Sequence, residues 1–394
     1  MKYVISYLLL LCFACLEMGF TKAEDDVWGF YGHRKINRMA VFTLPQDMLG
    51  FYKRNIEFIT EHAVDPDKRR YAIKEEAVRH YIDIDHWGED PFETVPRKFE
   101  KAFWKYAVVH ILDGKDTIKQ IIELDTHPQF SALEQFYNDY IYETKQEGKW
   151  VFRGEPYKVF KEILALKTRG SELHVEDKFS GYGILPYHLD DFYWRLANAF
   201  RNKNKENILR FSAEMGHYIG DAHVPLHTTE NYNGQLTDQL GIHAFWESRI
   251  PELFADDDYN FFVGKADYKK DMHGYMWSVI EDSHALLDSV LSIEKRLSIH
   301  FPENLQFCYD ERLERTVRVQ CPEYAAAYQA EMDGMVEQRM RDAVKSLGSV
   351  WYSAWVEGGS PDFSNWDKLT VEKSEDQKKL DQQYRQGNIY GREH

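Results

Sequence analysis

The sequence has little proline and glycine, and it lacks long apolar runs beyond its first residues. Its 394 residues include 12 prolines and 23 glycines without an internal repeat, which excludes a collagen-like, low-complexity or repeat protein. Beyond residue 15 no stretch approaches the roughly twenty apolar residues that span a membrane. With 43% hydrophobic and 29% charged residues, the composition is that of a soluble globular protein of one large or two ordinary domains.

Cysteine is scarce, and two of the four cysteines lie in an apolar segment at the start. Lys2, the apolar run from Val4 to Cys15 and the small-residue sequence TKA follow the order of a secretory signal peptide over residues 1–23. We therefore expect export to a periplasmic or extracellular location, with no transmembrane segment in the mature chain. A lipid anchor stays an alternative, although neither Cys12 nor Cys15 has a convincing lipoprotein context.

The other two cysteines are Cys308 and Cys321. In an oxidising compartment they could form one disulfide, and the alternative is two unpaired thiols in a loop. The predicted export favours the disulfide.

Positive charge is also scarce. The chain has 49 lysines and arginines against 65 acidic residues, a formal charge of −16, and removal of residues 1–23 takes away Lys2, Lys22 and Glu17, which changes −16 to −17. Such a surface repels polyanions at long range and argues against a protein that clamps duplex DNA. It does not argue against an enzyme whose site is made locally cationic by metal.

Alternating runs typical of strands are few, and long amphipathic stretches predominate. We predict an all-α fold, with one multi-helix domain over residues 28–360, an elaboration at 90–183 and a polar, charged tail at 361–394 that is mobile or loosely docked. Helices are predicted in residues 33–63 (two helices, broken near Pro45), 97–114, 116–125, 189–202, 205–223, 242–254, 272–297 and 324–355.

Common catalytic motifs are missing too. The chain lacks G-x-S-x-G, H-E-x-x-H, the P-loop pattern and, outside its first residues, C-x-x-C. What it has instead is GHYIGDAHVPLH at 216–227. On a helix His217 and Asp221 share a face and can hold one cation, Pro225 ends the helix, and His227 follows.

Further histidines and carboxylates of this kind recur along the chain. HAFWE places His243 and Glu247 four residues apart, and further upstream lie Asp65, His80 and His33. One pair alone is most often a chance feature of a helix, but four separated segments indicate a site. Imidazole and carboxylate ligands suit zinc, with manganese, iron and cobalt as competitors, and eight candidate side chains suit a cluster of ions.

Other polar residues near these segments have ordinary interpretations. His223 faces away from the neighbouring histidines by helical spacing, which favours a surface or supporting role. Asp83 and Asp85 either hydrogen-bond to ligand histidines or are solvated loop carboxylates.

The order of these motifs resembles a known family. W-x4-H from Trp28, D-x14-H-x2-D from Asp65, H-x3-D-x5-H from His217 and H-x3-E from His243 are similar to the zinc-dependent phospholipase C and S1/P1 nuclease superfamily. The resemblance covers motifs between residues 28 and 247. It implies an all-helical protein that holds three zinc ions.

The resemblance also implies a ligand set. One ion would be held by Asp65, His80, His217 and Asp221, and a second by His227, His243 and Glu247. A third would use His33, the bridging Asp221, and the amine and carbonyl of Trp28. That last pair requires Trp28 to be the mature N-terminus, so cleavage or trimming would have to extend to residue 27 rather than end at Ala23.

The chemistry implied is hydrolysis of a phosphate ester. Zinc lowers the pKa of bound water from about 15.7 to about 7 and binds phosphoryl oxygens. Asp65 would both bind metal and orient or deprotonate the attacking water. A nearby cation, Lys68, Arg69 or Arg70, would offset negative charge, and Tyr81 offers an aromatic face to a nucleobase or a lipid head group.

Three functions stay open at this point. A phospholipase C-like activity is favoured by Glu247 as the last ligand, by the short connection from His227 to His243 and by the acidic charge. The alternative is a nuclease of the S1/P1 type, acting on single strands, or a 3'-nucleotidase. The third is a non-catalytic module that keeps the zinc scaffold.

Overall fold

The computed structural model describes residues 30–142, 148–312, 315–366, 375–386, 389, 390 and 392. The predicted signal peptide and Trp28 lie outside these residues. No helix in the described ranges is long and apolar enough to cross a membrane.

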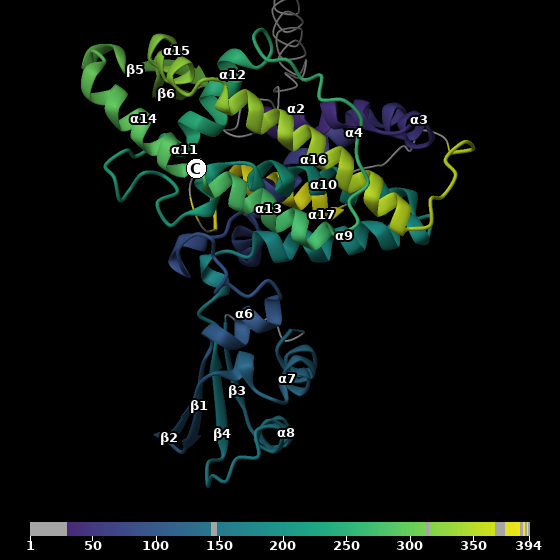
Figure 1. The fold of residues 1–394 in the computed structure, drawn as a ribbon, viewed down its shortest axis with the longest axis vertical. Coiled ribbons are helices and arrows are strands. Elements are labelled where there is room, and N and C mark those ends of the chain that lie inside the picture. Colours follow the sequence, from purple (N-terminus) through teal and green to yellow (C-terminus); the bar gives the residue numbers. More distant parts are fainter. Residues whose placement is uncertain are drawn as a thin grey trace, which may run out of the picture.

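Most of the described chain folds into a helical body, which fills the upper part of Figure 1. Its α-helices are α2 (Phe30–Ala40), α3 (Gln46–Arg54), α4 (Ile56–Glu61), α5 (Asp65–Arg69), α9 (Leu185–Arg201), α10 (Lys205–Ala222), α11 (Ile242–Ala244), α12 (Ile250–Phe254), α13 (Met272–His284), α14 (Leu287–His300), α15 (Pro322–Glu331), α16 (Met335–Glu357) and α17 (Glu375–Gln386). Short 3-10 helices cover Val41–Thr43, His62–Val64, Lys74–Arg79, Ile84–His86, Leu124–Thr126, Ser180–Tyr182, Pro225–Thr228 and Glu303–Leu305, and π-helical turns cover Tyr137–Ile141 and Phe245–Arg249.

Helix α10 lies at the centre of this body and contacts α2, α9 and α16 (Figure 1). It begins after Asn204, whose side chain accepts a hydrogen bond from the backbone N–H of Asn207 at 3.1 Å. Every residue from Ser212 to Ala222 is buried. The last turns of α10 therefore carry His217 and Asp221 into the interior, on one face.

Two glycines allow α2 to lie close against α10. A Cβ at Gly216 would lie 1.7 Å from Oδ1 of Asn37, and a Cβ at Gly220 would lie 2.7 Å from Nδ1 of His33. The side-chain amide of Asn37 uses this proximity and donates to one carbonyl of α4 and one of α10, both at 2.9 Å. Any larger residue at either glycine would push His33 away from the centre.

The region predicted as an elaboration forms a four-stranded antiparallel sheet, which extends below the helical body in Figure 1. Its strand order is β2-β1-β4-β3, with β1 (Val108–Asp113), β2 (Asp116–Ile121), β3 (Lys149–Phe152) and β4 (Glu172–Glu176). Helices α6 (Phe99–Tyr106), α7 (Phe130–Phe136) and α8 (Glu155–Ile163) pack beside it. A separate hydrophobic core, which includes Trp104, Phe136 and Phe160, lies between sheet and helices.

The all-α prediction is wrong in this region, although the chain is mostly helical. The helix predicted over 97–114 ends at Tyr106, and the one predicted over 116–125 is mainly strand β2. The β-branched residues Val108, Val109 and Ile111 favour a strand, and alternate residues of β1 are buried as in a sheet with one covered face. Two long predicted helices are also interrupted, after His284 and Glu331.

A second, two-stranded sheet carries the disulfide. Strands β5 (Phe307–Arg312) and β6 (Arg315–Gln320) pair antiparallel, and Cys308 is bonded to Cys321, which confirms the pairing favoured from the sequence. Arg249, in the π-helical turn, donates to Asp310 at 2.8 Å and to the carbonyl of Gln320 at 3.0 Å. These bonds attach the hairpin to the segment that carries Glu247.

The predicted tail is docked where the structure describes it. Helix α17 lies against α5, and Asp381 lies 3.9 Å from the ammonium of Lys68. The ring of Tyr384 stacks on Phe30 and meets the edge of Tyr71, with centroid distances of 5.9 and 5.0 Å. The tail therefore packs on the side of the body where α5 begins.

Candidate metal centre

Histidines and carboxylates from separate parts of the chain converge inside the helical body. Their ligand atoms form three groups, and within each group all ligand atoms lie within 4.8 Å of one another. The groups are His33, His217 and Asp221; Asp67, His80 and His217; and His227, His243 and Glu247. Five imidazoles and three carboxylates thus meet in one region, and such a set of ligand atoms could hold metal ions.

The carboxylate of Asp221 lies between all three groups. Its Oδ2 is 3.0 Å from Nδ1 of His80 and 3.5 Å from Nε2 of His217. Its Oδ1 faces the other way, 3.4 Å from Nε2 of His33 and 4.0 Å from Nε2 of His227. A carboxylate whose two oxygens face separate histidines in this way could bridge two ions.

The carboxylate of Glu247 also faces two groups. Its Oε2 lies 2.7 Å from Nε2 of His243 and 3.2 Å from Nε2 of His227, while its Oε1 lies 3.5 Å from Nε2 of His33. Glu247 belongs to the π-helical turn Phe245–Arg249, a local geometry that is common at functional sites. The sequence assigned Glu247 to one ion, whereas this position is within reach of two.

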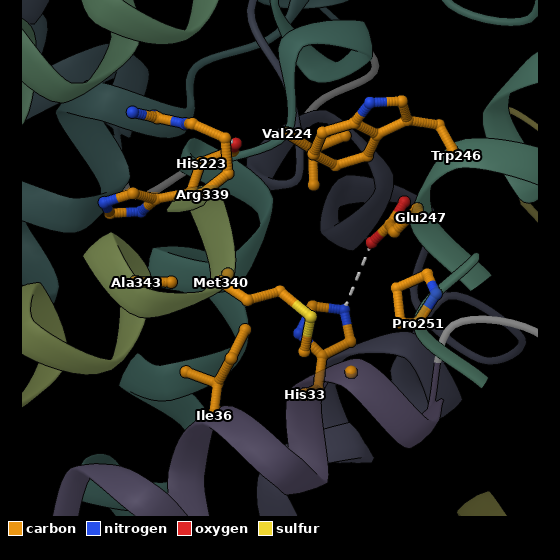
Figure 2. A pocket seen from close by; sticks show the side chains of 12 residues that line it. His33, Ile36, His223, Val224, Trp246, Glu247, Pro251, Arg339, Met340 and Ala343 are labelled. Carbon is orange, nitrogen blue, oxygen red and sulfur yellow. Dashed lines mark hydrogen bonds and ion pairs between the residues drawn. The ribbon is translucent and has the colours of Figure 1, made fainter. Parts of the chain in front are cut away.

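One side of this contact is closed by apolar residues. Figure 2 shows His33 from α2 and Glu247 from the π-helical turn pointing toward each other across a pocket. The pocket is lined in part by Ile36, Val224, Trp246, Met340 and Ala343. An apolar lining lowers the local dielectric and strengthens the attraction between a cation and its ligands.

The histidine tautomers are fixed from outside the cluster. His217, His227 and His243 each point Nδ1 at a backbone carbonyl oxygen, at 3.1, 2.6 and 3.1 Å respectively. Donation of the Nδ1 proton to that oxygen leaves each Nε2 as a bare acceptor that points inward, the usual arrangement around zinc.

Ring nitrogens also face one another at the centre. Nε2 of His227 lies 3.2 Å from Nε2 of His243, and Nδ1 of His80 lies 3.0 Å from Nε2 of His217. Two lone pairs repel at such distances unless a cation or a proton lies between them. Among the described residues Nδ1 of His33 has no hydrogen-bond partner, so its tautomer is set by what binds at Nε2.

The ionisation of the cluster matches a site for cations. Burial, followed by the nearby carboxylates Glu247 and Asp67, raises the pKa of Asp221 well above its usual value. Burial and His33 lower the pKa of His217 to about 4, and burial and His217 lower the pKa of His80 far below its usual value. Positive charge at the centre would relieve the repulsion between the carboxylates and suit the neutral imidazoles.

A buried charge network lies behind His80. The carboxylate of Glu76 is fully buried, and its Oε1 lies 3.8 Å from Nε2 of His80. Tyr218 donates to Glu76, and Arg69 and Arg79 pair with it at 3.2 and 2.7 Å. Among the described residues Nε2 of His80 has no hydrogen-bond partner, so Glu76 acts on His80 through its charge, an arrangement that the sequence analysis did not predict.

Asp67, and not the predicted Asp65, lies in the cluster. Oδ1 of Asp67 is 3.8 Å from Nδ1 of His80 and 3.6 Å from Nε2 of His217. The carboxylate of Asp65 instead lies 2.6 Å from Nδ1 of His62. Helix α5 begins at Asp65, and two positions on a helix differ by about 200°, so only one of the two carboxylates can face inward.

We therefore expect Asp67→Asn to lose about one zinc per chain and more than about 100-fold in activity, because it removes a ligand. Asp65→Asn, the matched control two residues away, should keep its full metal content. Elemental analysis of both variants after zinc supplementation measures the difference. Zinc loss in Asp65→Asn with none in Asp67→Asn would restore the assignment made from the sequence.

Two of the cationic side chains predicted to lie near the site, Lys68 and Arg69, pair with carboxylates outside the cluster. Arg69 lies in the network behind His80, where it pairs with Glu76 and, at 3.0 Å, with Glu214. Lys68 lies between Asp65 at 4.0 Å and the tail. The arginine next to the cluster is Arg70, which donates to Asp67 at 3.3 Å. Lys68 and Arg69, for which a substrate-binding role was predicted, are thus paired with other carboxylates, and Arg70 is the arginine that contacts the cluster.

Neither Asp83 nor Asp85 bonds to a ligand histidine. Asp85 accepts from Thr229 and from the backbone N–H of Glu230, at 2.5 and 3.1 Å, and so fixes the loop after His227. Asp83 is buried and pairs with Arg392. Burial raises the pKa of Asp83 to about 6, in spite of the opposing effect of that arginine.

The remaining predicted positions are structural or lie at the rim. His223 is buried, not on the surface, and its ring bonds to the carbonyl of Ile219 at 2.7 Å and to Ser346 at 3.1 Å. The hydroxyl of Tyr81 donates to Gly181 at 3.2 Å. The face of the Tyr81 ring is covered by the guanidinium of Arg392, whose carbon lies 3.7 Å from the ring centroid.

Comparison of the chain with protein-family models and with curated proteins gave no match. The assignment of a function therefore depends on the geometry of this site.

Proposed function

We propose that the protein is a zinc-dependent phosphodiester hydrolase of the phospholipase C and S1/P1 nuclease type. The observation that carries the proposal is the position of Asp221, whose two oxygens face separate groups of histidines. A carboxylate shared in this way is suited to ions a few ångströms apart, and closely spaced ions are typical of enzymes that cleave phosphate esters. Three zinc ions would fit the three groups.

Zinc at these positions would polarise phosphoryl oxygens and supply a water nucleophile at neutral pH. The chain's own residues orient the reaction. Asp67, held by Arg70, replaces Asp65 as the carboxylate placed to orient or deprotonate the water. Arg70 offsets the negative charge that develops on the phosphate, and it keeps that position through Asp67.

The disulfide supports an exported protein. Cys308 and Cys321 are bonded in the described structure, and disulfides persist mainly in oxidising compartments. We propose a periplasmic or extracellular location, in keeping with the signal-like residues 1–23.

The substrate that we favour is a phospholipid-like phosphodiester. The proposal depends on Glu247 as last ligand, on the short connection from His227 to His243 and on the charge of −16, which disfavours long polyanions. One observation favours the alternative, a single-strand nuclease or 3'-nucleotidase. Tyr81 and Tyr232 present ring faces beside the buried carboxylate of Asp83, where a planar group with N–H donors would fit.

We expect one zinc-loaded preparation to hydrolyse phosphatidylcholine micelles faster than single-stranded DNA, RNA or 3'-nucleotides. Rates on all four substrates at equal ionic strength measure the preference, and Asp257→Asn, at an exposed acidic position, is the control for charge. Cleavage of the nucleic acids without the lipid would reverse the substrate assignment but retain the metal chemistry. Full zinc content with no hydrolysis of any phosphodiester would support the non-catalytic module instead.

A further inference from the structure

We propose that the segment of Tyr390 and Arg392, beyond α17, is an internal competitor for the substrate, with Arg392 in an aromatic groove formed by the rings of Tyr81 and Tyr232. This inference rests on the proposed function, because it takes the groove next to the cluster to be where substrate binds. It concerns a regulatory contact inside the chain.

The groove is connected directly to the ligands. Tyr81 follows His80, and the carbonyl of Tyr232 lies 3.1 Å from Nδ1 of His243. The backbone N–H of Ile82 donates to the carbonyl of His227 at 2.9 Å. The backbone that carries the two tyrosines is therefore bonded to His227 and His243 of the candidate metal centre.

Arg392 rests in that place. Its guanidinium carbon lies 3.7 Å from the ring centroid of Tyr81 and 4.5 Å from that of Tyr232. The same guanidinium donates to the carboxylate of Asp83, and its other nitrogen lies 3.5 Å from the carbonyl of Thr229. Stacking on aromatic rings and pairing with a buried carboxylate are the interactions that suit a planar, charged donor.

The buried carboxylate of Asp83 needs a hydrogen-bond donor at the place that Arg392 occupies. Its side chain is buried, and within the described residues Oδ1 has no hydrogen-bond partner. A buried carboxylate is costly without a donor. When Arg392 leaves, a donor from substrate or water has to take its place, so binding of substrate and binding of Arg392 exclude each other.

The backbone of the segment is held by Arg70. The N–H of Tyr390 donates to the carbonyl of Arg70 at 2.9 Å, and the guanidinium of Arg70 donates to the carbonyl of Arg392. Arg70 is also the cation that contacts Asp67. The segment thus uses a residue of the site for its own attachment, while α17 anchors it from a distance through Tyr384 and Asp381.

The first readout is docking, and it needs no activity. In the zinc-loaded full chain the amide of Tyr390 should exchange with deuterium slowly, and Arg392→Ala should speed that exchange at least about tenfold. Arg392→Lys keeps the charge but loses the planar guanidinium. Its exchange rate at the Tyr390 amide should therefore lie between the rates of the unmodified chain and of Arg392→Ala. Tyr390→Ala, which removes a side chain that is 46% exposed, and Arg169→Ala, at an exposed arginine of the inserted region, are the controls.

The second readout is competition. If the segment is docked for about nine-tenths of the time, its release should lower KM for bis(p-nitrophenyl) phosphate about tenfold and leave kcat within about twofold. A Tyr390 amide that is unprotected in the unmodified chain overturns the proposal. Release of the segment in Arg392→Ala without a change in KM also overturns it, because the segment would then be only a structural strap.

Failure of the proposed function gives a different result. If no variant hydrolyses any phosphodiester, phenylphosphonate serves as the probe, with an aryl ring for the groove and an anion for the metal. Faster exchange at Tyr390 on addition of phenylphosphonate, together with tighter binding to Arg392→Ala by calorimetry, supports the competition without enzymatic activity. Equal binding to both chains and unchanged exchange overturns it.

Discussion

Removal of the metal ions should abolish phosphodiester hydrolysis and lower the unfolding temperature by about 6 °C or more. The candidate ligands come from α2, α5, α10 and the turns around His80, His227 and Glu247, so bound ions would hold these segments together in the interior. An ion at 100 times its Kd stabilises the folded state by about 2.7 kcal/mol, so two ions contribute about 5 kcal/mol. For a chain of this length, with an unfolding entropy of about 2.1 cal/mol/K per residue, that corresponds to about 6 °C.

Without ions, the remaining network is unfavourable. Nitrogens of His227 and His243 face each other at 3.2 Å, and the carboxylates of Asp221 and Asp67 repel each other. Calorimetry of the chelated and zinc-restored protein measures the change, with magnesium as the control ion, because imidazole nitrogens bind it poorly. A shift of less than about 3 °C, or at most one zinc per restored chain, would contradict the cluster.

The local chemistry of the site could be predicted from short-range spacing. Four-residue spacing on a helix fixed the pairing of His217 with Asp221, and it fixed that of His243 with Glu247 even though the second pair lies on a π-helical turn. These positions depend on one helical repeat, so few tertiary contacts can change them.

Other positions depend on contacts that the sequence does not reveal. Asp65 and Asp67 are two residues apart, and which one faces the histidines depends on how α5 packs against α10 and α17. The carboxylate of Asp65 then forms a local contact with His62. From the sequence either Asp65 or Asp67 could face the histidines. The D-x14-H spacing to His80, taken from the resemblance, favoured Asp65, whereas Asp67 lies in the cluster.

The strands of the inserted region were missed for a related reason. Lys119 and Gln120 in β2 have no strong strand preference, and they pair with Ile111 and His110 of β1 across a turn. Pairing with β1, which itself pairs with the distant strand β4, thus outweighed the helical pattern. Docking of Arg392 into the groove was equally hidden, because it joins residues 309 positions apart.

Asp221→Asn should cost more metal and more activity than Glu247→Gln. Both changes keep the size of the side chain and replace one oxygen by an amide nitrogen, which cannot bind zinc while it carries its protons. Asp221 faces four histidines, His33, His80, His217 and His227, so its loss affects all three groups. Glu247 faces His33, His227 and His243, and the group built on His80 stays intact without it.

We expect Asp221→Asn to lose about two zinc ions per chain and more than about 100-fold in kcat/KM, and Glu247→Gln to lose about one ion. Metal analysis and kinetics on equally supplemented preparations measure both effects, with Asp257→Asn as the exposed control. Because Glu247 also faces His33, the comparison tests whether Glu247 itself bridges two ions, a question that the sequence did not raise. If Glu247 bridges as fully as Asp221 does, the two variants will lose equal amounts of zinc, and the bridge will have to be assigned to both carboxylates.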